Sequence, residues 1–138
     1  MRSALLRHLT VGGGSTLGGA EPAISDAVRH GDLLYLSGRA PVDPATLALV
    51  AESFEEQARA VLRDVEAVLA AAGSTLQHVI RAQCFLADAA DFPAWNRIWC
   101  ETFAPPRPAR TTVLCAMTVP GMRIEVEVVA AVAGGERG

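Results

Sequence analysis

The sequence predicts one α+β domain in which two helices cover one face of a mostly antiparallel sheet. Two stretches have apolar residues at helical spacing, shorter runs have the composition of strands, and glycine or proline turns separate them. The predicted order along the chain is β-β-β-α-β-α-β-β. Each helix can bury its apolar face on the same sheet, which makes two layers. The 138 residues fit one domain, and a composition that is 51% hydrophobic supplies a packed core.

The first part of the chain predicts a short strand, a loop and a hairpin. Residues 3–11 can form the strand, and residues 12–22 are so rich in glycine that we expect a flexible loop that does not pack. A phosphate-binding loop is disfavoured there because no GK[ST] sequence and no helical pattern follow. Apolar runs at 27–30 and 33–37, separated by Gly31 and Asp32, predict the hairpin.

The clearest element is a helix over about residues 52–72. Its apolar stripe consists of Phe54, Ala58, Val61, Leu62, Val65, Val68, Leu69 and Ala72. Ser53 followed by Glu56 three residues later is a capping box, and Gly73 suits a left-handed helix stop. The opposite face carries acid-to-base pairs such as Glu55 with Arg59, which are typical of a solvated surface.

A strand at 79–86 and a second helix at about 92–103 follow. Pro93 lies in the first turn of this helix, where the missing N–H does no harm. The helix has large apolar residues at helical spacing, namely Trp95, Ile98, Trp99 and Phe103. We expect them to belong to the core or to a subunit contact rather than to a cofactor site.

The last two strands carry the candidate chemistry. A proline-rich loop delivers Arg110 to the start of one strand, and a turn at Pro120 and Gly121 leads to a strand with Glu125 and Glu127. We expect these strands to be neighbours, so that an arginine and a carboxylate form a small acid-binding site. Arginine binds a carboxylate through two parallel hydrogen bonds, and a glutamate can deprotonate a water. A polar row on a strand is also typical of a solvent-facing surface.

Composition excludes several function classes. The net charge of −3 disfavours an electrostatic nucleic-acid surface. All twelve basic residues are arginine, so a Schiff-base or phosphate-loop lysine is absent from the sequence. The three cysteines have no spacing of a disulfide framework or metal site, which indicates thiols of a reduced cytoplasm. No apolar run long enough to span a membrane occurs, and we expect no signal peptide and no metal.

Several segments together resemble the RidA family, also called the YjgF family, of small enamine and imine deaminases. They are SGRAPVDP at 37–44, a long run at 55–92, PARTTV at 108–113 and PGMRIEVEVVA at 120–130. The resemblance covers the region from about residue 22 to residue 132, and the last two segments are its most diagnostic part.

The resemblance implies a chorismate-mutase-like fold and a homotrimer with active sites between subunits. It implies that Arg110 holds the substrate carboxylate and that Glu125 activates water. The residues it places at the substrate are Gly38, Arg39, Asn96, Thr112 and Ile24. The implied reaction converts a 2-imino acid into a 2-oxo acid and ammonia, with a small carboxylic acid as substrate and no metal or organic cofactor. The family pattern often has a cysteine where this chain has Thr112.

Three positions depart from the family pattern. Where many members read G-P-Y-S-Q-A, this chain has PAISDA, which puts Ile24 at the tyrosine position and Asp26 at the glutamine. The usual S-G-Q becomes Ser37-Gly38-Arg39. One wall of the pocket is therefore less polar at Ile24 and more charged at Arg39, which favours a larger or more apolar substrate than 2-aminoacrylate.

Three functions remain open from the sequence. The first is the deaminase, in a general or a specialised biosynthetic role. The second is a module that binds a small carboxylic acid without turning it over, which the loss of the tyrosine favours and the retention of Arg110 and Glu125 disfavours. The third is an interaction role such as a chaperone-like or ribonuclease activity, and a net acidic chain argues against RNA cleavage.

Overall fold

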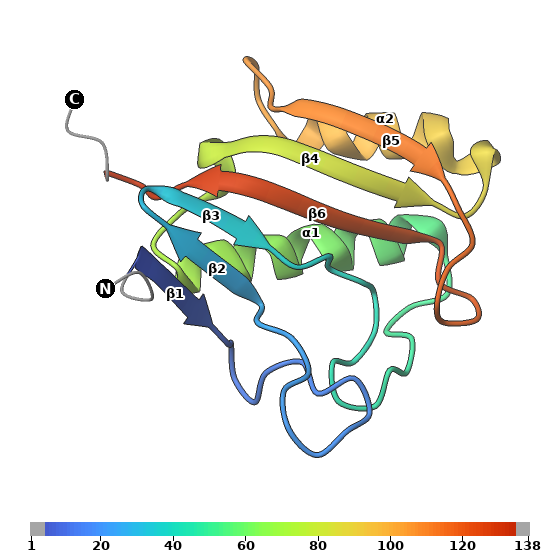
Figure 1. The fold of residues 1–138 in the computed structure, drawn as a ribbon. Helices are drawn as coiled ribbons and strands as arrows, with labels where there is room; N and C mark the ends of the chain where they lie inside the picture. The colour runs from blue at the N-terminus through green and yellow to red at the C-terminus, as the bar shows by residue number, and fades with distance from the viewer. Residues whose placement is uncertain (1–4, 135–138) are drawn as a thin grey trace.

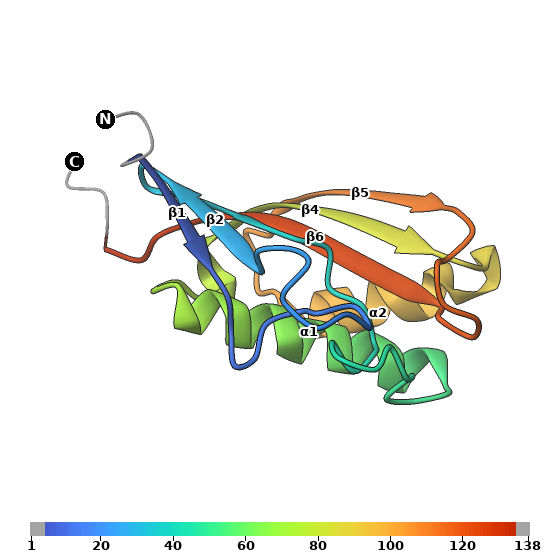
Figure 2. The same ribbon diagram turned by 60° about the horizontal axis from the view of Figure 1, so that its bottom comes forward.

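The protein folds as a six-stranded sheet with two helices on one face (Figures 1 and 2). The computed structural model describes residues 5–134. The elements are β1 (Leu6–Leu9), β2 (Ala27–His30), β3 (Leu33–Leu36), α1 (Phe54–Ala71), β4 (Val79–Leu86), α2 (Phe92–Thr102), β5 (Ala109–Leu114) and β6 (Ile124–Ala131). This order and the α+β class confirm the prediction. The predicted frayed tail lies, apart from its first residue, outside the described residues.

The sheet order corrects one expectation about the last two strands. The order is β1-β2-β3-β6-β4-β5, so β4 lies between β5 and β6, and these two strands are not neighbours. All pairs are antiparallel except β4 with β5, which are parallel. The reason is that α2 is a crossover from β4 to β5, and a helical crossover returns the chain parallel to the strand it left. The edge of β4 on the other side then remains for β6.

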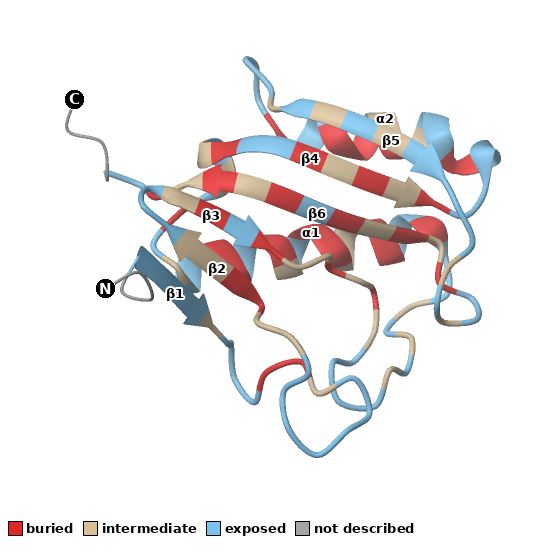
Figure 3. Cartoon of the chain, viewed as in Figure 1, coloured by how far each residue is buried: buried red, intermediate tan, exposed pale blue. Residues whose placement is uncertain are grey.

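The core lies between the sheet and the helices. Successive side chains of a strand point to opposite faces, and the residues of β6 that face the helices, Ile124, Val126 and Val128, are almost fully buried. Figure 3 shows the alternation of buried and exposed residues along the strands. Within residues 5–134 the other face of the sheet has no covering layer, and Tyr35 and Val113 on that face are 46% and 38% exposed.

Both helices bury the stripes that the sequence predicts. In α1 the whole predicted stripe is buried except Ala72, which is partly buried at the helix end. In α2 the aromatic residues Trp95 and Trp99 belong to the core, with exposed fractions of 0% and 5%. Their rings contact each other edge to face, with centroids 5.8 Å apart. The interpretation of these aromatic residues as core is therefore confirmed.

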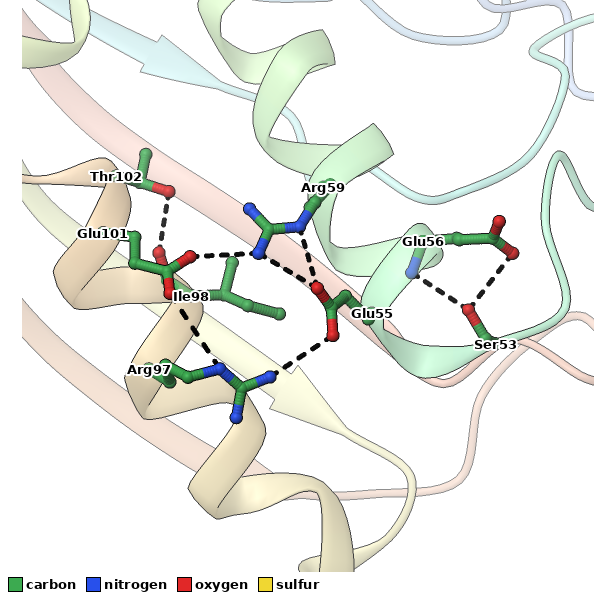
Figure 4. Close-up of polar contacts among 8 residues, drawn as sticks. All are labelled: Ser53, Glu55, Glu56, Arg59, Arg97, Ile98, Glu101 and Thr102. Carbon is green, nitrogen blue, oxygen red and sulfur yellow. Dashed lines mark hydrogen bonds and ion pairs between the residues drawn. The ribbon is translucent and has the colours of Figure 1, made fainter.

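The exposed charges of α1 extend to α2 (Figure 4). Arg59 binds Glu55 at 3.0 Å in its own helix and also Glu101 of α2 at 3.0 Å. Arg97 of α2 lies 3.3 Å from Glu55, which closes a four-residue network. The same figure shows the helix start, where the Ser53 hydroxyl accepts from the Glu56 backbone N–H at 3.1 Å. Exposed ion pairs of this kind each contribute little to the free energy of unfolding, so this network is a minor part of the contact between α1 and α2.

One polar side chain of α1 is completely buried. Gln57 donates from Nε2 to the carbonyl oxygens of Ala51 and Gly121 at 3.1 and 3.0 Å, and its Oε1 accepts from the Arg123 backbone N–H at 2.8 Å. These bonds attach α1 to the turn that precedes β6. A fully buried side-chain amide needs hydrogen-bond partners, and these three backbone groups supply them.

We expect Gln57→Leu to reduce the free energy of unfolding by about 3 kcal/mol, because it removes three hydrogen bonds of a fully buried side chain, each worth about 1 kcal/mol, while nearly conserving volume. Chemical denaturation with a linear extrapolation measures the loss. Gln83→Leu, on the uncovered face of β4, is the control and should change stability much less. Equal effects of the two substitutions would contradict the role of Gln57.

Candidate functional site

The predicted site residues form two separate clusters in one chain. The first surrounds Arg110, the second residue of β5. The Nη2 of Arg110 donates to Oδ1 of Asn96 on α2 at 2.7 Å. The guanidinium carbon lies 5.1 Å from the ring centroid of Trp99 and 5.8 Å from that of Phe92. Arg110 therefore faces the helix layer and is seated among two aromatic rings and one amide.

This arrangement leaves Arg110 able to bind an acid. Among residues 5–134, no carboxylate lies within ion-pair distance of its guanidinium. The aromatic rings hold the cation by cation–π attraction and displace water around it. A partly desolvated arginine with unused donors binds a carboxylate through charge-assisted hydrogen bonds. Thr112, two residues along the same face, has a buried hydroxyl without a hydrogen-bond partner in the described part of the chain.

The second cluster surrounds Glu125, which lies on the uncovered face near the start of β6. Glu125 is half-buried, and its carboxylate lies directly against Gly38. A Cβ at position 38 would overlap the carboxylate oxygen and would lie 3.0 Å from the Cδ of Glu125. A residue without a side chain is therefore needed at position 38 for the carboxylate to occupy its place.

The surroundings of Glu125 favour its protonated form. Burial is the largest effect that raises the pKa of this carboxyl, and the neighbouring Glu127 raises it further. The positive charge of Arg39 opposes both effects without cancelling them. A carboxyl whose pKa is moved toward neutrality is suited to accept and return a proton near physiological pH.

Arg39 lies behind Gly38 and turns its side chain toward the helix layer. Its Nε donates to Asp64 of α1 at 2.8 Å, and its Nη1 donates to Asp26 at 3.0 Å. Only 7% of the residue is exposed. Burial by itself would lower the pKa of Arg39, but the bonds to Asp64 and Asp26 hold it above its ordinary value. The prediction that Arg39 contacts substrate stays a prediction, and the structure gives its guanidinium two protein partners.

The glycine-rich segment is attached to this cluster through Asp26. The carboxylate of Asp26 accepts from the Val11 backbone N–H at 2.8 Å and from the Ser15 hydroxyl at 2.7 Å. These bonds hold the pKa of Asp26 below its ordinary value, although burial, the largest single effect, raises it. Ser15 is only 5% exposed. Part of the loop therefore packs, contrary to the sequence expectation, because a buried carboxylate supplies polar partners. Its flexibility stays a prediction.

A cavity adjoins the second cluster on the helix side. Its volume is about 700 Å³, and Ile24, Gly38 and Arg39 lie in its wall together with apolar loop residues such as Leu17 and Val42. This volume is in the range of small-molecule sites. Three of the predicted substrate-binding residues thus share one hollow, and Asn96 and Thr112 lie with Arg110 at the other cluster.

The two clusters do not meet within one chain. Arg110 pairs in register with Ala82 and shares its buried helix-facing side, whereas Glu125 pairs with Phe85 on the uncovered side. The strand β4 also separates them laterally. A single ligand therefore cannot contact both residues of the same protomer in this arrangement.

Sequence reasoning did not identify several contributors to the clusters. Phe92 and Trp99 hold Arg110, and Asp64 pairs with Arg39. A signal existed for the pair of Asp26 and Arg39, since both positions depart from the family pattern with opposite charges. The described residues contain no group of three metal-ligating side chains, and none of their helices is long and apolar enough to cross a membrane.

Comparisons with known proteins agree with one another. The family model described as Endoribonuclease L-PSP matches residues 19–132. A RutC family protein of Saccharolobus solfataricus is 39% identical over 106 residues, which cover 77% of this chain and 84% of that protein. The chloroplastic Reactive Intermediate Deaminase A of Arabidopsis thaliana is 36% identical over 106 residues, covering 77% of this chain and 57% of that protein. RidA from an Antarctic Psychrobacter has a TM-score of 0.77 at 30% identity, covering 91% of this chain and 100% of that one.

We expect Glu125→Gln to raise the melting temperature at pH 7. A raised pKa in the folded state means that ionising Glu125 opposes folding, so the penalty develops as the pH rises above the ordinary value of 4.5. The stability gain should therefore disappear as the pH falls below 4.5, where the wild-type carboxyl is protonated in both states. Thermal denaturation across this pH range measures it. Glu66→Gln, an exposed position on α1, is the control, and an equal gain there would contradict the interpretation.

Proposed function

This chain belongs to the RidA (YjgF) family, and from that premise we propose that it hydrolyses 2-imino acids, and their enamine tautomers, to 2-oxo acids and ammonia. The observation that carries the proposal is the environment of Arg110. Its guanidinium packs against the Trp99 ring, is bonded to Asn96 and keeps donors free for an α-carboxylate. Glu125 against Gly38 supplies the second function, a carboxyl with a raised pKa. The relative named Reactive Intermediate Deaminase A supports the same reaction class.

The chemistry needs only a carboxylate-binding group and a proton acceptor. Arg110 binds the substrate carboxylate and orients the protonated C=N group. Glu125 takes a proton from water while the water oxygen forms a bond to the imine carbon, and the π electrons of the C=N bond move to nitrogen. The resulting carbinolamine receives the proton on its nitrogen. The C–N bond then breaks, ammonia leaves, and loss of the hydroxyl proton forms the 2-oxo acid.

We further propose that a homotrimer completes the site between subunits. One chain holds Arg110 and Glu125 on opposite sides of its sheet, so a second copy must bring its own Glu125 cluster to the Arg110 cluster. The uncovered face of the sheet, with Tyr35 and Val113 exposed, is an apolar surface that supports assembly. Closed rings of identical subunits form through such contacts.

The cavity beside Gly38 favours a substrate with a larger apolar side chain. Its wall contains Ile24, Leu17 and Val50, and its volume exceeds the need of a three-carbon acid. A dedicated role in a specialised pathway fits such a substrate. RNA cleavage, the activity in the name of the matching family model, is disfavoured by the net charge of −3.

We expect the wild type to accelerate ammonia release from freshly generated 2-imino acids, more for bulky apolar side chains than for small ones. Arg110→Ala should lower kcat/KM by about ten- to a hundredfold, because it removes a charge-assisted contact to the carboxylate. Arg97→Ala, which removes an exposed arginine of α2, is the matched control and should have little effect. A folded wild type that binds carboxylic acids but hydrolyses no imino acid would instead indicate a binding module.

The inter-subunit site is tested by coexpressing Arg110→Ala with Glu125→Gln. Each variant alone should keep no more than about a tenth of the wild-type activity. Random mixing in trimers should restore about a quarter of the wild-type activity, because one site in four combines an intact Arg110 from one copy with an intact Glu125 from another. Mixed oligomers that stay as inactive as the parents would contradict the shared site. Light scattering on the same samples measures the number of subunits.

A further inference from the structure

The most buried charges of residues 5–134 lie next to the Glu125 cluster. Asp26 is 1% exposed and Arg39 is 7% exposed, whereas the other ion pairs of the described residues involve more exposed side chains. Burying an ion pair costs desolvation, and such pairs often add no net stability. A buried pair at this position therefore needs a reason beyond holding the fold together.

The hydrogen bonds of Asp26 and Arg39 hold the segment of backbone that contains Gly38. Asp26 holds the loop at Val11 and Ser15, and Arg39 joins Asp26 to Asp64 of α1. The backbone of Arg39 donates to the Val126 carbonyl at 2.7 Å and accepts from the Val126 N–H at 3.1 Å. The segment that carries Gly38 is thus fixed to β6 by its backbone and to the loop and α1 by the Arg39 side chain.

We propose that Arg39, held by Asp26 and Asp64, is a positioning residue for Glu125. It fixes Gly38 as the floor on which the Glu125 carboxylate rests, and it contributes positive charge behind that floor. Neither role requires its guanidinium to touch a substrate. The assignment of Glu125 as the proton acceptor rests on the proposed function, but the positioning of its carboxyl by Arg39 does not.

The charges around Glu125 make the effect measurable. Glu127 of the same strand opposes ionisation, and Arg39 favours it. The register partner on β4 is Phe85, which carries no charge, and Gly38 on the other side carries none. Removing the charge of Arg39 should therefore raise the pKa of Glu125. Removing the charge of Asp26 leaves Arg39 less neutralised, so it should not raise that pKa.

The test is carboxyl titration by NMR of protein labelled with ¹³C at the glutamate side chains, with the Glu125 signal assigned by its loss in Glu125→Gln. We expect Arg39→Gln to move the Glu125 midpoint to higher pH. Asp26→Asn should leave the midpoint unchanged or move it to lower pH. In the double variant the neutral pair should regain part of the stability lost in the single variants, and the upward midpoint shift should persist.

The direction in which the Glu125 midpoint moves distinguishes a positioning role of Arg39 from a general loosening of the structure. A purely structural role would admit water to Glu125 in both single variants and would lower its midpoint in each, which would overturn the proposal. Arg97→Gln removes the same charge from α2, where Arg97 pairs with Glu55 and Glu101, and should leave the midpoint unchanged. A shift as large as that of Arg39→Gln would also overturn it.

The pH dependence of activity provides a second test that is independent of the titration. If imino acids are substrates, the acidic limb of the profile of kcat/KM against pH should move to higher pH in Arg39→Gln and not in Arg97→Gln. If no imino acid is hydrolysed by the wild type, the proposed function fails, and the titration still decides whether Arg39 positions Glu125.

Discussion

The position of β6 between β3 and β4 is the constraint on which the rest of the structure depends. Because side chains alternate along a strand, one central strand sends Ile124, Val126 and Val128 into the core and Glu125 to the opposite face. Its backbone also binds Arg39 on one side, which brings Gly38 against the Glu125 carboxylate. A shift of register by one residue would place the glutamates in the core and the valines in solvent.

The same sheet order explains why the candidate site is divided. The crossover through α2 places β5 outside β4, and α2 itself then covers the face of β5 that carries Arg110. Arg110 thereby contacts Asn96 through a hydrogen bond and packs against two aromatic rings. The glutamate remains on the face without helices, where only another molecule can approach it. In the function that we propose, this division links catalysis to assembly, since neither half of the site is complete in one copy.

The two clusters also differ in how they use charge. Arg110 has neutral and aromatic neighbours, so its charge remains available to a ligand. Arg39 is paired with two aspartates, which hold its guanidinium within the protein instead of leaving it open to a ligand. The Ser15 hydroxyl of the glycine-rich loop donates a hydrogen bond to one of these aspartates, Asp26. Two arginines that look alike in the sequence thus have opposite roles because of the residues that the fold places around them.

By itself, the sequence determined the element order, the apolar stripe of α1 and the core role of Trp95 and Trp99. It also determined which residues of each strand share a face with Arg110 or with Glu125. All of these follow from local periodicity. It also carried the family motifs. Only the tertiary structure decided that β4 separates the last two strands, that Gln57 is buried and bonded, and that Asp26 and Arg39 pair across 13 positions of sequence. These features depend on contacts between distant segments, and neither propensity nor spacing specifies which distant segments meet.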